Sequence, residues 1–223
     1  MVLNSNMRNN IYSIILVCFL VVSCREQQTT REKKVITLPF YTSADFMPRW
    51  LENNEAASAH RIPAFCFVDQ LGDTITEQTV ANKIYVAGFF FTSCPGICKT
   101  LTNHLSLVQK AYKDDPKVLL LSHSVTPESD SIPRLLQYAN SFDVQAAKWH
   151  LLTGNRTAIY RIAREAYFAD EDMGETKTIN DFLHTENLLL IDTQRRIRGV
   201  YKGTSARDVQ DLIADIKILE QEQ

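Results

Sequence analysis

Apolar residues fall into short continuous runs that predict the strands of this chain. Residues 83–91 are β-branched, aromatic or apolar at almost every position, which is typical of a central strand buried on both faces. Further apolar runs predict strands at 64–69, 118–121, 149–152, 187–192 and 196–202. The last two flank a short polar turn and therefore form a predicted hairpin.

Between these runs, apolar residues recur at the spacing of a buried helix face. One such helix carries Leu101, Leu105 and Val108 and stops at Asp114-Asp115-Pro116. Helical spacing after capping residues predicts further helices that begin near Asp130-Ser131, Asn155 and Thr204-Ser205.

The alternation of strands and helices favours an α/β fold with a central mixed β-sheet flanked by helices. A thioredoxin-like fold is the simplest match to this order of elements. Residues 35–223 show no repeat and no linker, so we expect one domain there, with an extra N-terminal segment and a polar insertion at 169–181 before the last hairpin. In such a sheet, the loops at the carboxyl ends of the strands gather the functional groups.

Composition then limits the partners. Hydrophobic residues make up 45% of the 223 residues, which is enough for a buried core. The formal net charge is -2, and no sustained basic run is interleaved with aromatic residues. We therefore expect no nucleic acid among the partners.

The first 23 residues differ from the rest of the chain. An apolar stretch at 11–22 is too short to span a bilayer comfortably, so residues 1–23 are predicted to be a secretory signal peptide. It ends in Val21-Val22-Ser23-Cys24, which resembles a bacterial lipobox and implies a lipid on Cys24. The polar residues 24–34 would tether an exported domain to a cell-envelope membrane, facing the periplasm or the cell exterior. An uncleaved N-terminal anchor is the alternative, and it gives the same location.

Cys94 and Cys98 carry the main chemical signal of the chain. They enclose Pro95, Gly96 and Ile97 directly after the predicted central strand. Such a pair can be a disulfide, a thiol nucleophile with its resolving thiol, half of a metal site, or packing. An exported domain favours the first three alternatives.

The proline between the cysteines sets their expected geometry. It disfavours helical backbone at the preceding residue, so Cys94 is predicted just outside a helix and Cys98 in its first turn. In a regular helix, residues four apart have Cβ atoms about 5–6 Å apart, and a disulfide needs about 3.5–4.5 Å. An irregular start would let the sulfurs form a disulfide or converge on one soft cation. The unpaired N–H groups at the helix start are expected to lower the pKa of both thiols.

The remaining candidate residues are two histidines and a third cysteine. A thioredoxin-type oxidoreductase has a two-residue spacer between its cysteines and a cis-proline opposite them, whereas this chain has a three-residue spacer and His184 near the expected proline position. Two thiolates and one imidazole suit Cu(I) and can hold Cu(II), and the ligand types leave zinc open. His123 is either an auxiliary ligand or a polar strand-end residue. Cys66, which alternates with Phe65 and Phe67, is expected to be a buried core thiol.

Several motifs follow one another in an order that points to a family. They are Phe-Thr-Ser-Cys-Pro-Gly-Ile-Cys at 91–98, Ser-Val-Thr-Pro-Glu-Ser-Asp at 124–130, Trp-His-Leu-Leu-Thr-Gly at 149–154, and His184 before the apolar run 188–192. Over residues 60–220 the chain resembles the Sco/SenC family of copper-binding thioredoxin-like proteins, whose corresponding motifs include F-T-x-C-P-x-x-C, S-V-D-P-E-R-D and W-x-x-L-T-G.

The resemblance implies a copper chaperone that binds one copper through Cys94, Cys98 and His184. Its implied task is to assist assembly of the copper centre of cytochrome c oxidase, with subunit II of that enzyme or another cuproprotein as client. The resemblance also implies a thiol-disulfide reductase, in which Cys94 and Cys98 are a redox pair that closes into a disulfide and is reopened by a thiol reductant protein. Enzyme activity is therefore left open.

Three residues depart from the family pattern. Gly96 stands where relatives usually have an acidic residue, Lys99 where they have proline, and Thr126 where they have aspartate. The loss of two carboxylates is expected to weaken Cu(II) binding. Lys99 adds positive charge beside Cys98, which favours the thiolate.

Overall fold

The computed structural model describes residues 37–169 and 185–222. The predicted signal peptide, the tether with Cys24, almost all of the insertion at 169–181, and His184 lie outside the described residues. The elements in chain order are α2 (Asn53–Ser58), β1 (Cys66–Val68), β2 (Thr74–Thr76), β3 (Ile84–Phe90), α3 (Ile97–Ala111), β4 (Val118–Ser124), α4 (Ile132–Ser141), β5 (Trp149–Leu152), α5 (Arg156–Arg161), η1 (Ile162–Ala166), β6 (Asn187–Ile191), β7 (Ile197–Lys202) and α6 (Ala206–Gln221).

Five strands form the central sheet in the order β5-β4-β3-β6-β7. β3, β4 and β5 run parallel, β6 pairs antiparallel with β3, and β7 pairs antiparallel with β6. The mixed sheet flanked by helices confirms the predicted fold class. The register of β3 and β4 pairs Phe90 with Ser124, so the loops that follow these two strands leave the sheet at the same edge.

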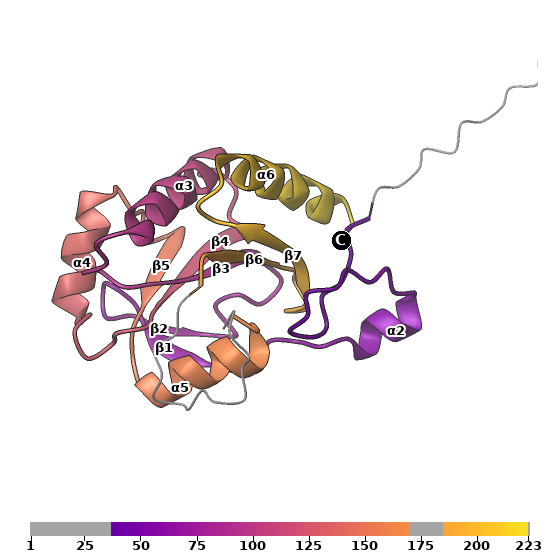
Figure 1. Ribbon diagram of the computed structural model, residues 1–223, viewed down its shortest axis with the longest axis horizontal. Coiled ribbons are helices and arrows are strands. Elements are labelled where there is room, and N and C mark those ends of the chain that lie inside the picture. Colours follow the sequence, from indigo (N-terminus) through magenta and orange to yellow (C-terminus); the bar gives the residue numbers. More distant parts are fainter. Residues whose placement is uncertain (1–36, 170–184, 223) are drawn as a thin grey trace, which may run out of the picture. The chain divides into compact units, whose positions relative to one another are not determined.

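Two apolar layers hold the helices onto the sheet. On one face, side chains of α3, α4 and α6 pack against alternate residues of the strands, such as Val86, Phe90 and Leu120. On the other face, α5, η1 and the β1–β2 hairpin pack against the intervening residues, such as Tyr85, Phe89 and Leu121. Figure 1 shows α3 and α6 on one side of the sheet and α5 on the other. Successive side chains on each strand therefore pack into two separate hydrophobic cores, one on each face of the sheet.

Most predicted elements are confirmed, and the differences are local. β4 continues to Ser124, beyond the apolar run that predicted it, because Ser122, His123 and Ser124 are buried as well. Asn155 and Ser205 cap α5 and α6 through their side-chain oxygens. The strand β2 and the helix α2 were not predicted.

The prediction that Cys66 is a buried core thiol is wrong. Cys66 is exposed at the start of β1, in a two-stranded sheet with β2. Phe65 and Phe67 are buried on the sheet-facing side, so the side chain between them points outward, as the two-residue period of a strand requires. Cys66 lines a surface pocket instead, together with Arg161 and Glu165.

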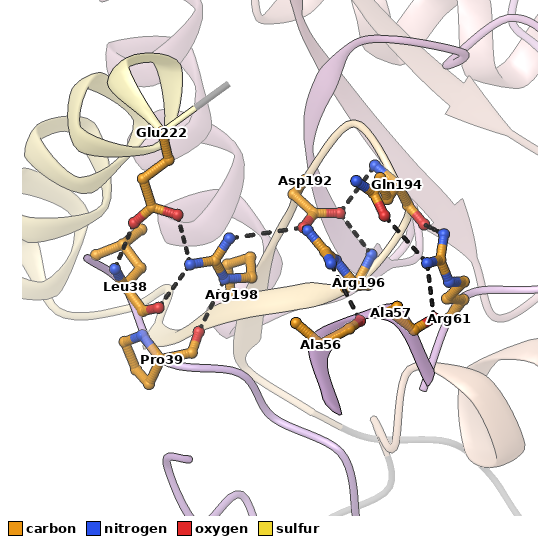
Figure 2. A network of polar contacts seen from close by, with 10 residues as sticks. All are labelled: Leu38, Pro39, Ala56, Ala57, Arg61, Asp192, Gln194, Arg196, Arg198 and Glu222. Carbon is orange, nitrogen blue, oxygen red and sulfur yellow. Dashed lines mark hydrogen bonds and ion pairs between the residues drawn. The ribbon is translucent and has the colours of Figure 1, made fainter. Parts of the chain in front are cut away.

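Residues 38–40, near the start of the described chain, are held in place by Arg198 of β7, which is 4% exposed (Figure 2). Its guanidinium donates to the carbonyl oxygens of Leu38 and Pro39 and pairs with Glu222 at 2.6 Å. It also lies over the ring of Phe40, 4.1 Å from its centroid. Since β7 begins at the edge opposite the ends of β3 and β4, the described chain begins at the edge opposite the cysteine loop.

No helix among the described residues combines the length and apolar character needed to cross a membrane.

Candidate metal centre

The cysteine loop leaves the carboxyl end of β3 and runs directly into α3. The amide of Cys94 donates to the carbonyl of Phe91 at 3.3 Å, which closes a turn over Thr92 and Ser93. Gly96 is the N-cap of α3, so Cys94 lies before the helix and Cys98 in its first turn. This confirms the placement predicted from the proline.

The two sulfurs lie under the surface as free thiols. Cys94 is 9% exposed and Cys98 is 5% exposed. Burial raises the pKa of Cys94, but hydrogen bonds from the amides of residues 96–98 and from the Cys98 thiol bring it below its ordinary value. Burial raises the pKa of Cys98 to about 12, and the neighbouring Cys94 sulfur and Asp130 carboxylate add to the rise.

The prediction that the helix start lowers the pKa of both thiols is therefore correct for Cys94 and wrong for Cys98. The amides at the helix start are directed at Cys94. Cys98 is buried more deeply, and its thiol donates a hydrogen bond to the Cys94 sulfur. The pair thus has one sulfur prepared as a thiolate and one that holds its proton. The structure describes the reduced pair, and the disulfide between them stays a prediction.

A small cavity adjoins Cys98. It is lined by three consecutive aromatic residues at 89–91, by Ile97 and Val125, and by Thr185. Thr185 is 6% exposed, and it is the residue that follows His184 in the chain. The Cys98 thiol is thus a soft donor in the wall of a largely apolar cavity.

Asp130 lies on the other side of the loop and was not predicted as a site residue. The sequence suggested a capping role for it, but α4 begins with Ser131 as its N-cap and without a side-chain capping bond. The Asp130 carboxylate instead accepts hydrogen bonds from Thr92, Ser124 and Thr126. Its place at the end of the motif 124–130 was the signal available in the sequence.

His123 is the penultimate residue of β4 and does not line the cavity beside Cys98. Of the two predictions, the strand-end residue fits, although it is buried, and the auxiliary ligand does not. It is fully buried on β4, on the face opposite Ser122 and Ser124. Its ring packs against Phe89 at 5.2 Å and Tyr167 at 5.5 Å between ring centroids. Within residues 37–169 and 185–222, neither ring nitrogen is within hydrogen-bonding geometry of a partner.

Among the described residues, no three His, Cys, Asp or Glu side chains are grouped so that they could hold a metal ion. The described part of the site supplies the two sulfurs. The third predicted ligand, His184, lies outside the described residues.

Comparison with known proteins decides the family. The family model described as SCO1/SenC matches residues 53–220, which is most of the chain and includes the whole cysteine loop. The chain belongs to the SCO1/SenC family. This confirms the resemblance found in the motifs.

Individual relatives of this SCO1/SenC protein are distant but cover the domain. The SCO1 protein homolog of Bacillus subtilis is 26% identical over 162 residues, covering 71% of this chain and 82% of the relative. A SCO1/SenC family lipoprotein from Bacillus anthracis has a solved structure with a TM-score of 0.64, 27% identity, and coverage of 72% of this chain and 95% of the relative.

A third relative was solved with its metal. The structure of Bradyrhizobium japonicum ScoI with copper bound has a TM-score of 0.58 and 27% identity, and the match covers 72% of this chain and 99% of that protein. These solved structures agree with the thioredoxin-like architecture seen here.

The buried His123 predicts a specific pH dependence of stability. Burial lowers the pKa of His123 to about 4, so the unfolded chain binds a proton here more readily than the folded chain. Stability supplied by the neutral ring is full above about pH 6.5 and is lost as the pH falls toward 4. His123→Phe removes this loss and fits the aromatic surroundings.

Urea unfolding of both chains at pH 8 and pH 5 measures the effect. The advantage of His123→Phe over the parent chain should grow by about 2 kcal/mol between pH 8 and pH 5. An advantage that is equal at both pH values would contradict the buried, neutral state of His123.

Proposed function

We propose that this SCO1/SenC protein is a copper chaperone that carries one copper on Cys94, Cys98 and His184. The observation that supports this most is the pair of buried thiols at the start of α3, one of which has a lowered pKa. Thiolates are soft ligands that select Cu(I), and a nearby imidazole extends the site to Cu(II). A buried, apolar surrounding keeps water away from the cargo.

The cavity beside Cys98 supports His184 as the third ligand. Thr185, the residue that follows His184 in the chain, lines that cavity. Copper bound to ScoI of Bradyrhizobium japonicum, at 27% identity, supports the same cargo here.

The client we propose is the copper centre of cytochrome c oxidase, in its subunit II, or that of another cuproprotein. Family membership supports this choice. A structural neighbour from the same family is described as a member of the Sco family of cytochrome c oxidase assembly proteins.

Copper titration of the reduced chain without oxygen tests the cargo. The chain should bind about one Cu(I), and Cys94→Ser and Cys98→Ser should each lower the affinity at least about 100-fold because two-sulfur coordination is lost. His184→Ala should weaken binding less for Cu(I) than for Cu(II), since Cu(II) prefers nitrogen ligands.

Two control variants separate ligands from other residues of the same type. Cys66→Ser removes an exposed thiol on the β1–β2 sheet. His104→Gln removes an imidazole whose Nδ1 is hydrogen-bonded to the carbonyl oxygen of Gly203. Both should keep full copper affinity. Copper binding that survives in Cys94→Ser and Cys98→Ser would contradict the proposal.

A second candidate function is supported by the unequal thiols. In a thiol-disulfide reductase, the Cys94 thiolate attacks a partner disulfide, forming a mixed disulfide and releasing one partner thiolate. Cys98 then loses its proton and attacks the Cys94 sulfur, which releases the reduced partner and leaves the Cys94–Cys98 disulfide. Two electrons pass to the partner, and a thiol reductant protein must restore the pair.

Trapping the mixed disulfide tests this second function without copper. In a Cys66→Ser background, Cys98→Ser should accumulate a mixed disulfide on Cys94 with an oxidised dithiol peptide. Cys94→Ser should accumulate at least about tenfold less on Cys98, because attack needs a thiolate and Cys98 is buried and protonated. Equal trapping on both residues would rule out the assigned roles.

We also propose that residues 1–23 are a cleaved signal peptide, that Cys24 carries the lipid, and that residues 24–34 tether the domain at 35–223 outside the cytoplasm. The solved relative from Bacillus anthracis is described as a lipoprotein, which supports this. Cys24→Ser should move the chain from the membrane fraction of the bacterial cell to the soluble fraction or leave its signal uncleaved. Unchanged mass and membrane association would refute lipidation.

A further inference from the structure

Asp130 is a fully buried carboxylate held by neutral donors. Its Oδ1 accepts from the Thr92 hydroxyl at 2.5 Å, and its Oδ2 accepts from the Ser124 hydroxyl at 2.6 Å and the Thr126 hydroxyl at 3.1 Å. The Thr92 amide donates to both oxygens, at 3.4 and 3.3 Å. The exposed fraction of Asp130 is 0%.

Among the residues that the structure describes, no ion pair includes Asp130 directly. Arg134 approaches, but its Nε donates to the Thr92 hydroxyl at 3.0 Å. A buried carboxylate without a counter-ion costs several kcal/mol, even where hydrogen bonds satisfy its oxygens. A fold that keeps such a charge has a use for it, or for the geometry it imposes.

Asp130 is hydrogen-bonded to the loop that carries the thiol pair. Asp130 contributes to the raised pKa of Cys98 and of Tyr138, which packs in the same layer. It also holds Thr92, the first central residue of the turn that ends at Cys94. Asp130 therefore reaches the site in two ways, through the backbone of the loop and through its charge.

We propose that Asp130 is the positioning residue of the copper site: it fixes the Cys94 turn through Thr92, and its carboxylate favours Cu(II) over Cu(I). This inference rests on the proposed copper site. Two thiolates with Cu(I) carry a net negative charge, whereas the same ligands with Cu(II) are neutral. A fixed negative charge nearby therefore destabilises the Cu(I) state relative to the Cu(II) state.

The position also bears on two residues that depart from the family pattern. Gly96 and Thr126 stand where relatives usually have carboxylates, and Thr126 donates its hydroxyl to Asp130. The carboxylate that this chain retains beside the loop is thus buried behind it.

Three variants separate the effect of the Asp130 charge, the effect of the hydrogen bond from the Thr92 side chain, and the loss of any one hydrogen bond to the carboxylate. Asp130→Asn removes the charge and keeps the size. Its amide nitrogen donates, so the hydroxyls of Ser124 and Thr126 must turn to accept from it. Thr92→Val removes the hydrogen bond between the Thr92 hydroxyl and Asp130 and keeps the charge of Asp130. Ser124→Ala removes a hydrogen bond of the same carboxylate that does not lead to the loop. Thermal unfolding of each full chain shows that the variant is folded before binding is measured.

Competition with Cu(I) and Cu(II) chelators gives the two dissociation constants of each folded chain. Asp130→Asn should shift the ratio of Cu(II) to Cu(I) affinity about tenfold toward Cu(I). Thr92→Val should weaken both affinities together and leave the ratio within twofold of the parent. Ser124→Ala should change neither. A ratio that Asp130→Asn leaves unchanged, or that Ser124→Ala shifts equally, would overturn the charge role.

A measurement on the metal-free, reduced chain tests, independently of copper, whether the hydrogen bond between Thr92 and Asp130 orders the Cys94 turn. Exchange of the Cys94 amide hydrogen, which bonds to Phe91, should be at least about tenfold faster in Thr92→Val and unchanged in Ser124→Ala. Unchanged exchange in Thr92→Val would overturn the positioning role. Failure of the parent chain to bind copper would refute the proposed function, and the exchange result would still decide whether Asp130 orders the loop.

Discussion

The site depends on one hydrogen-bonded sulfur at the start of a helix. The Cys94 sulfur accepts hydrogen bonds from the amides of residues 96–98 and from the Cys98 thiol. These hydrogen bonds favour its negative charge although it is buried. Burial, the neighbouring Cys94 sulfur and the Asp130 carboxylate raise the pKa of Cys98 in spite of a hydrogen bond with the Phe91 backbone, so Cys98 keeps its proton. Capture of a soft cation and attack on a disulfide both begin from this unequal pair.

The rest of the fold maintains that arrangement. The parallel pairing of β3 with β4 brings the cysteine loop and the 124–130 motif to one edge of the sheet, where Asp130 joins them. At the opposite edge, Arg198 fastens the N-terminal segment to β7 and to the end of α6 (Figure 2). The first described residues, which follow the predicted membrane tether, are thus held at the end of the sheet opposite the thiols.

Much of the fold could be predicted because its signals are local. The continuous apolar run of β3, the helical spacing of α3 and the caps Asn155 and Ser205 each specify an element within a few residues. The short strand β2 was missed because three residues, only one of them buried, carry little periodicity. The burial of Cys66 was wrongly predicted because apolar neighbours in the sequence do not say which face of an edge strand is covered.

The sequence by itself determined the family, the α/β order of elements and the placement of Cys94 before the helix and Cys98 within it, since proline geometry and hydrophobic spacing act over short distances. Only the tertiary structure decided which thiol is acidic, that His123 is buried away from the site, and that Asp130 holds the loop. These properties depend on burial and on groups such as Thr92 and Asp130, which lie 38 residues apart in the chain. Desolvation and hydrogen bonding are set by what the fold brings together, and a pattern along the chain does not contain that information.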